Sequence, residues 1–353
     1  MTESPRDTGR RLFPAPSDEE SPEGTGVLGL LSGVAEGVRR DDPDALAGYA
    51  RAAATGNTDA QYELARLLVS RNTLSAGNRE AAKWLRKAAA RDHAASEALL
   101  GLLYARGQGV RQNPERAVEL FRAAALAGNP DAGYSLGIAL ENGFGTKEDK
   151  REALSWYRIA GAQGNVRAQL KVGLCYAHGS GCRPDPIQAA LWMRRAASAG
   201  YSRAQLELGL FYAEDRGPQR EKHAREAIRW MKAAASDGLP EAQYRLAVQL
   251  SLGIGCEPDK EKAIAWARSA ASQGHPNALL FLSSALARGD GLPQNIPGAL
   301  ALALCVQRLT SGELGRDTAA AVEAAATSAD RAEARRLEAG NLDPGALVAS
   351  LVR

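Results

Sequence analysis

Residues 153–164 read ALSWYRIAGAQG, and residues 189–200 read AALWMRRAASAG. Each stretch starts with alanine, has a tryptophan three positions later and a pair of small residues at seven and eight, and ends on glycine. The pattern recurs at intervals of 36 residues, with a single interval of 38. Its first alanines are Ala81, Ala117, Ala153, Ala189, Ala227 and Ala263, with weaker copies at Ala45 and Ala299. A constant period of this length is typical of repeat proteins in which each unit packs on the next.

A second pattern precedes each of these stretches, as in AGYSLGIAL at 132–140 and AQLELGLFY at 204–212. Its apolar residues recur at helical spacing, which indicates an amphipathic helix. Glycine-rich turns such as GFGT at 143–146, and a final glycine such as Gly164, allow the positive φ that reverses the chain or ends a helix. Copies of this first helix begin at Ala60, Ser96, Ala132, Ala168, Ala204, Ala242 and Ala278. The sequence therefore predicts an all-α fold, an α/α solenoid of helix–turn–helix repeats.

The tryptophans occupy one register of the second helix. They are Trp84, Trp156, Trp192, Trp230 and Trp266. A ring repeated at one position favours a structural role, so we expect each to fill the core between one repeat and the next, burying about 150–250 Å².

The combined pattern, A-x-x-x-L-G-x-x-Y, then G-x-G-V, then K/R-A-x-x-W-Y-x-x-A-A-x-x-G, resembles the SEL-one-like repeat family, whose members are relatives of tetratricopeptide repeats. The resemblance covers roughly residues 44–310. It implies a right-handed superhelix that acts as a non-catalytic scaffold or adaptor for partner proteins. The first full repeat departs from the pattern because it lacks the G-x-G turn, and the fifth departs because EDRGPQREKHARE at 214–226 replaces it.

The chain is expected to divide into four parts. Residues 1–24, rich in Pro, Ser, Glu and Gly, predict a disordered tail. Residues 25–58 predict a degenerate capping unit, 59–312 seven SEL-one-like repeats, and 313–353 a C-terminal helical cap. Caps are expected because a terminal repeat has no neighbour to cover its apolar face.

Composition argues against several classes of partner. The chain has 44 basic and 41 acidic residues, a net charge of +3, and only short pairs of arginine, so no nucleic acid partner is expected. No run of 18 apolar residues occurs, which predicts no membrane insertion. The first residues lack the apolar core of a signal peptide, which predicts a cytoplasmic protein. We expect it to be monomeric by itself.

Motifs for catalysis, cofactors and metals are weak or missing. The stretch 133–137 matches G-x-S-x-G, but its serine falls within a predicted helix, whereas the hydrolase motif needs a strand before it. Cysteine-rich relatives in the resembling family are linked to penicillin binding, which leaves a hydrolase acting on cell-wall or amide substrates as an alternative. S-x-x-K, K-T-G, H-E-x-x-H and C-x-x-C do not occur, so no catalytic residue, cofactor or metal is predicted.

The resemblance implies that first helices line an inner, concave surface that binds one or more partner proteins or peptides. One inward register holds Tyr62, Tyr134 and Tyr244, and a neighbouring one holds Arg106, Asn142, His178, Glu214 and Arg288. Tyrosine and arginine are common anchors in interfaces. Two alternatives stay open: the tyrosines serve ordinary packing, since Leu170, Leu206 and Leu280 share their register, and the polar residues form ordinary solvated surface. Binding of a polyanion is a further alternative.

Overall fold

The computed structural model describes residues 43–71, 75–214, 217, 219–312, 314–340 and 343–352. All regular secondary structure in these ranges is helical, which confirms the predicted all-α class. The chain divides into two compact units, Met1–Ala196 and Ala197–Arg353. The predicted tail 1–24, and residues 25–42 of the predicted capping unit, lie outside the described residues.

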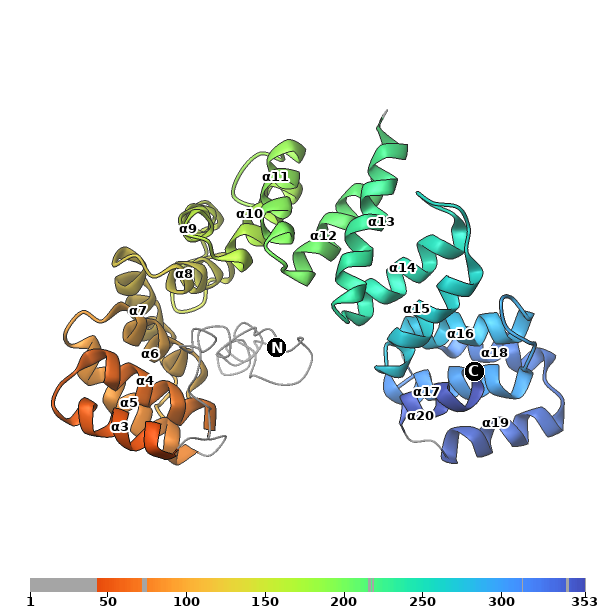
Figure 1. The fold of residues 1–353 in the computed structure, drawn as a ribbon, viewed down its shortest axis with the longest axis horizontal. Coiled ribbons are helices and arrows are strands. Elements are labelled where there is room, and N and C mark those ends of the chain that lie inside the picture. Colours follow the sequence, from red (N-terminus) through yellow and green to blue (C-terminus); the bar gives the residue numbers. More distant parts are fainter. Residues whose placement is uncertain are drawn as a thin grey trace. The chain divides into compact units, whose positions relative to one another are not determined.

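The first unit is built from helix pairs in which each helix packs on the next. Its helices are α3 Pro43–Ala54, α4 Thr58–Arg71, α5 Ser75–Ala89, α6 Ala94–Arg106, α7 Pro114–Leu126, α8 Pro130–Asn142, α9 Lys150–Ala162, α10 Val166–His178 and α11 Pro186–Ser198, which ends just beyond the unit. Figure 1 shows α6, α8 and α10 on one side of this unit and α7, α9 and α11 on the other. We call α4, α6, α8 and α10 the first-helix layer, and α5, α7, α9 and α11 the second-helix layer.

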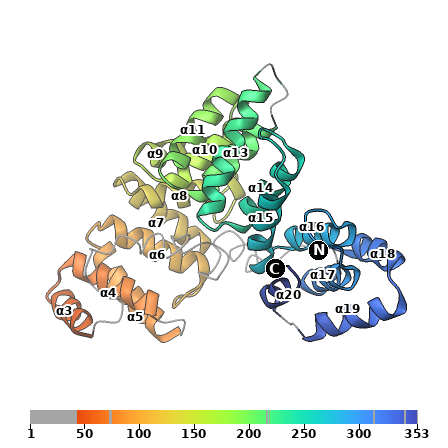
Figure 2. The same ribbon diagram turned by 45° about the vertical axis from the view of Figure 1, so that its right-hand side comes forward.

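The second unit continues the same pairing and then changes. Its helices are α12 Ser202–Ala213, α13 Arg220–Ser236, α14 Pro240–Leu252, α15 Lys260–Ser272, α16 Pro276–Arg288, α17 Ile296–Leu309, α18 Arg316–Ala325, α19 Ser328–Gly340 and α20 Pro344–Leu351. Helices α18, α19 and α20 all pack on α17, as Figure 2 shows, and α20 also packs on α15. Arg268 Nη1 on α15 donates to the Val352 carbonyl at 3.2 Å. The end of the chain thereby covers second helices of two repeats.

Glycines end the helices where the sequence predicts. Gly143 and Gly145 in the turn after α8 have φ of 66° and 65°, and Gly164 after α9 has φ of 96°. A Cβ on Gly145 would lie 2.3 Å from the Pro114 carbonyl of the preceding repeat. This turn therefore needs glycine both for its backbone conformation and for its close contact with the neighbouring repeat.

Large side chains of the second helices enter gaps left by glycines of the first helices. A Cβ on Gly137 of α8 would lie 2.3 Å from the ring of Tyr157 on α9, and one on Gly173 of α10 would lie 2.6 Å from Met193 on α11. Both large residues are at most 1% exposed. The pairs are Gly101 with Phe121, Gly137 with Tyr157, Gly173 with Met193 and Gly209 with Met231.

The prediction for the tryptophans needs a correction. Trp192 is buried, at 9% exposed, but the other four are only partly buried. Trp84 packs at the edge of the core and carries the Lys87 ammonium 4.2 Å from its ring centre. The residue after the tryptophan takes the central position, because that is the side chain directed at the first-helix glycine.

Candidate functional site

The eight residues predicted to bind a partner lie on first helices or at their ends, and they fall into both units. The first unit holds Tyr62, Arg106, Tyr134, Asn142 and His178, and the second holds Glu214, Tyr244 and Arg288. They form two sets, each with its own surroundings.

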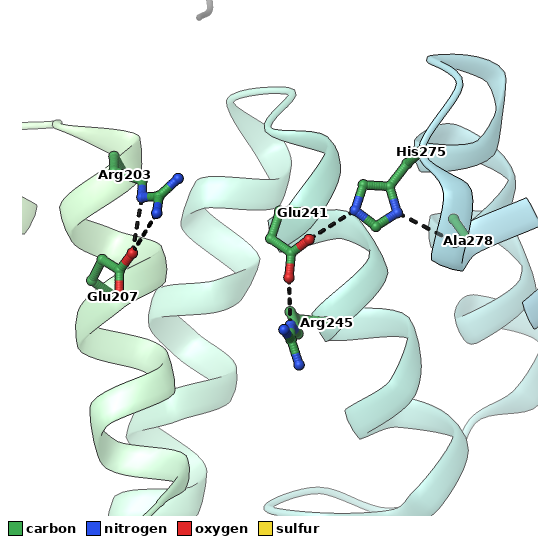
Figure 3. Close-up of polar contacts among 6 residues, drawn as sticks. All are labelled: Arg203, Glu207, Glu241, Arg245, His275 and Ala278. Carbon is green, nitrogen blue, oxygen red and sulfur yellow. Dashed lines mark hydrogen bonds and ion pairs between the residues drawn. The ribbon is translucent and has the colours of Figure 1, made fainter. Parts of the chain in front are cut away.

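Tyr244 belongs to a polar joint between two successive first helices, α14 and α16. Its ring stacks on His275 at a centroid distance of 5.2 Å. His275 caps α16: its Nδ1 accepts from the Ala278 backbone N–H at 3.3 Å, which leaves Nε2 to donate to Glu241 Oε2 at 2.8 Å (Figure 3). Arg245 Nε donates to the other oxygen of Glu241 at 2.6 Å. The hydrogen bonds from His275 and Arg245 lower the pKa of Glu241 to about 2, although burial opposes them.

Tyr62 takes part in the same kind of joint in the first unit, between α4 and α6. Its ring lies 5.5 Å from that of His93. His93 Nδ1 accepts from the Ser96 backbone N–H at 3.2 Å, and Nε2 lies 3.1 Å from Asp59 Oδ1. Burial raises the pKa of Tyr62 to about 12. The tyrosine is thus neutral and largely enclosed.

Tyr134 lies in a third joint, in which asparagine replaces histidine. Asn165 Nδ2 donates to Asp131 Oδ1 at 2.8 Å, and Arg167 pairs with the same oxygen at 3.1 Å while lying 5.0 Å from the Tyr134 ring centre. In all three joints the helix-capping residue follows the acid by 34 positions. The tyrosines therefore help to hold successive repeats together, a role that this spacing in the sequence could have revealed.

Two residues in the register of polar candidates, Arg106 and Asn142, have side-chain atoms that face the protein itself. Arg106 is largely buried. Its Nε and Nη1 have no hydrogen-bond partner among the described residues, and desolvation lowers its pKa to about 10. Asn142 Nδ2 donates to the Ile138 carbonyl of its own helix at 2.8 Å. Arg106 is only partly exposed, whereas Asn142 is exposed.

His178, Glu214 and Arg288 of the same register are exposed. Leu252 also belongs to this register and is 63% exposed. Sequence reasoning missed it because only polar side chains were sought there, although the register itself marks it. The open positions therefore carry an imidazole, a carboxylate, an aliphatic group and a guanidinium in different repeats.

A polar group around Glu141, at the end of α8, was also missed by the sequence analysis. Its Oε2 accepts from the Tyr157 hydroxyl at 2.7 Å and from Lys171 Nζ at 2.8 Å. Burial, followed by the charge of Glu141, raises the pKa of Tyr157 well above its ordinary value. This group links three consecutive helices, α8, α9 and α10. The available signal was a tyrosine at a register that holds Leu, Phe, Met or Ala in the other full repeats.

Two candidate nucleophiles, Ser135 and Cys175, have unsuitable surroundings. Ser135 lies inside α8, is 7% exposed, and donates its hydroxyl to the Asp131 carbonyl at 2.8 Å, so it does not form a nucleophile elbow. Burial raises the pKa of the Cys175 thiol to about 11, which keeps it protonated at neutral pH. Among the described residues, no three His, Cys, Asp or Glu side chains are placed to hold a metal ion.

Comparison with known protein families matches the Sel1 repeat to seven consecutive segments. They are 58–93, 94–129, 130–165, 166–201, 202–239, 240–275 and 276–305. The chain belongs to the Sel1 repeat family. The resemblance inferred from the sequence is thereby confirmed. No match was found among curated proteins.

The chain is also similar to solved structures. A Sel1 repeat protein from Oxalobacter formigenes is 28% identical, with a TM-score of 0.60 over 76% of this chain and 96% of that one. A protective antigen with an SLR fold from uropathogenic Escherichia coli is 22% identical, with a TM-score of 0.46 over 92% of this chain and 84% of that one. An immunity protein from Pseudomonas aeruginosa is 21% identical, with a TM-score of 0.38 over 66% and 86%.

Sel1 repeat proteins are generally scaffolds for protein–protein interactions and are typically not catalysts. Within the described residues, every helix is too short or too polar to cross a bilayer.

Proposed function

We propose that this Sel1 repeat protein is a non-catalytic, cytoplasmic scaffold, monomeric by itself, that binds partner proteins through the exposed faces of its first helices. The observation that carries the proposal is a contrast between registers. Positions that serve the fold repeat: glutamines Gln61, Gln169, Gln205 and Gln243 each donate to the backbone carbonyl eight residues earlier. The register of Arg106, Asn142, His178, Glu214, Leu252 and Arg288 instead holds five residue types in six repeats, and this variety leaves it free to match a partner.

The chemistry of the open positions fits a protein surface. In the second unit, Leu252 offers apolar area beside the turn after α14, while Arg288 supplies a guanidinium at the same register of α16. In the first unit, His178 is exposed at the end of α10. Interfaces combine apolar anchors with a polar rim in this way. Tyr62, Tyr134 and Tyr244 contribute ring edges from the joints, so they add area with little loss of side-chain freedom.

Affinity capture from native lysate, followed by mass spectrometry, tests the proposal. The variant Leu252→Ala with Arg288→Ala, and separately His178→Ala, should reduce recovery of at least one partner about 10-fold. Melting temperatures should stay nearly unchanged, because exposed substitutions rarely alter stability by more than about 0.5 kcal/mol.

The matched control is Leu309→Ala with Arg335→Ala. Leu309 lies on the second helix α17 and is 43% exposed, and Arg335 is exposed on α19. The control should recover the partners as well as the parent does. If the first-helix variants recover every partner equally well, first helices are not the binding surface.

A further inference from the structure

We infer that the second-helix layer of the first unit binds an extended, acidic segment of a partner protein. The residues that carry this are one arginine from each second helix, which we call the arginine row. The row consists of Arg86, Arg122, Arg158 and Arg194. It lies on a different layer from the proposed first-helix surface, so either inference can fail without the other.

Each member of the row occupies the same place on its helix. Each arginine lies five positions after the first alanine of its pattern, as Arg158 does after Ala153. These alanines are at most 1% exposed. Five residues turn the helix by about 140° from that buried alanine, which points the row away from the core. Arg86, Arg158 and Arg194 are exposed, and the side chain of Arg122 is 42% exposed. The row therefore faces outward in every repeat of the unit.

Contacts within the protein do not explain why this charge repeats. Arg86 Nη2 donates to the Tyr104 hydroxyl at 3.2 Å, whereas Arg122 Nη1 pairs with Glu152 Oε1 at 2.7 Å. Arg158 has no ion pair or hydrogen bond from its side chain within the described residues. The repeated glutamines, by contrast, make one and the same hydrogen bond in each repeat. Arg86, Arg122 and Arg158 therefore have no internal contact in common, and a shared external contact accounts for the repeated charge.

The two layers of the unit also differ in charge. In the second-helix layer, α5 carries a net +3, α9 +2 and α11 +2, while α7 is neutral. In the first-helix layer, α4 and α6 are neutral, and the −2 of α8 cancels the +2 of α10. The near-neutral total of the whole chain hides this separation. An anionic partner is therefore attracted to the second-helix layer and not to the first.

The spacing of the row favours an extended peptide. Side chains of neighbouring second helices meet, as Arg122 on α7 and Glu152 on α9 do at 2.7 Å, which puts successive second helices on the order of 10 Å apart. An extended chain rises about 3.3 Å per residue. A carboxylate at every third position could then meet successive arginines, whose planar guanidinium groups pair with carboxylates through two hydrogen bonds. Duplex DNA presents a charge about every 1.7 Å, which is much denser than the row. Partly buried tryptophans beside the row, such as Trp156, add flat apolar area for the peptide backbone.

The test uses the full chain and two synthetic peptides of equal composition. One has glutamate at every third position, and the other has the same glutamates clustered at one end. Fluorescence anisotropy should show that the spaced peptide binds more tightly than the clustered one. Raising the salt from about 50 mM to about 200 mM should weaken this binding strongly, because exposed charges are screened.

The variant Arg158→Glu with Arg194→Glu should weaken binding of the spaced peptide at least 10-fold, an effect on the scale of interfacial charge pairs. The control Lys147→Glu with Arg111→Glu makes the same change in net charge at exposed turn positions and should bind as the parent does. Circular dichroism of each variant checks that the helices remain. Equal binding of both peptides, tighter binding of heparin or DNA, or an equal loss in the control would overturn the inference and leave only a nonspecific attraction of polyanions.

Discussion

Gly137 and Tyr157 in the first unit occupy the same registers as Ala247 and Ala267 in the second. In the first unit, Gly137 on α8 has no side chain, which makes room for the fully buried ring of Tyr157 on α9. In the second unit both residues are alanine and both are fully buried. Close packing requires the two residues at such a contact to fit each other. The same repeat is therefore built in two ways. Gly209 and Met231 of the second unit follow the first way, so the difference lies between repeats, and residues at equal registers are not interchangeable between them.

The largest expected effect is that of Tyr157→Ala. It removes a buried ring and also leaves Glu141 without its hydroxyl donor. The free energy of unfolding of the first unit should fall by about 3–5 kcal/mol. Urea unfolding followed by circular dichroism measures this change. Ala267→Gly, at the same register of the second unit, should cost only about 1 kcal/mol as a helix-propensity effect; similar losses for both would contradict the comparison.

Gly137→Ala should be the next largest. The new methyl would lie 2.3 Å from the Tyr157 ring, and such overpacking costs about 1–3 kcal/mol, more than the gain of up to about 1 kcal/mol from alanine's helix propensity. In the Tyr157→Ala background the clash is gone, so the same substitution should stabilise. A double-mutant cycle measures the difference. Additive effects would show that the two residues do not constrain each other.

The fold was predictable because its signal is repeated. One helix pair is ambiguous, but the recurring alanines, turn glycines such as Gly143 and stop glycines such as Gly164 agree with one another in successive repeats. The tryptophans were assigned too deep a position. Repetition identifies a register but does not say which of two neighbouring residues, Trp156 or Tyr157, faces the gap left by Gly137.

The site was less predictable because its residues make contacts with residues of the next repeat. Tyr244 and His275 are 31 residues apart, and their contact depends on how two repeats stack. The burial of Arg106 likewise cannot be read from its register, since Arg288 at the same register is exposed. Variation between repeats marks positions that are free to change. It does not separate those that meet a partner from those that meet the adjoining repeat.

Arg106→Met and Arg288→Met compare a largely buried and an exposed arginine at the same register. Arg106 keeps a charge although its Nε and Nη1 have no hydrogen-bond partner in the described part of the chain. A methionine of similar length should therefore raise the free energy of unfolding by about 1–2 kcal/mol. Arg288→Met in the second unit should leave stability within about 0.5 kcal/mol, because Arg288 is exposed. Thermal and urea unfolding measure both. A destabilised Arg106→Met protein would mean that the guanidinium stabilises the fold.

Acid should affect the joint of the second unit more than that of the first. The pKa of Glu241 is lowered from 4.5 to about 2 by its hydrogen bonds to His275 and Arg245. A lowered pKa stabilises the fold above the unfolded-state pKa, and this contribution disappears as the pH falls from about 4.5 toward 2. Because the side chain is partly exposed, the contribution should be about 1 kcal/mol after screening. Glu241→Gln should flatten this part of the stability curve. Asp59→Asn should change it less, since the Asp59 side chain is 83% exposed.

The smallest expected effect compares Glu97 with Gln243, which share a register. Gln243 Nε2 donates to the Ala235 carbonyl at 3.1 Å, whereas Glu97 is buried and, as a carboxylate, has no proton to donate to the equivalent carbonyl of Ala89. Glu97→Gln should therefore stabilise by about 0.5–1 kcal/mol near neutral pH, and Gln243→Glu should destabilise. Burial, together with Asp92, raises the pKa of Glu97. A raised pKa means that the folded state takes up the proton first, so the wild-type carboxyl stabilises in acid and this is lost as the pH rises. The gain from Glu97→Gln should shrink in acid, where the protonated carboxyl can donate the same hydrogen bond. Urea unfolding at neutral and acid pH measures the two values; a gain that does not depend on pH would show that the carbonyl is not the partner of this side chain.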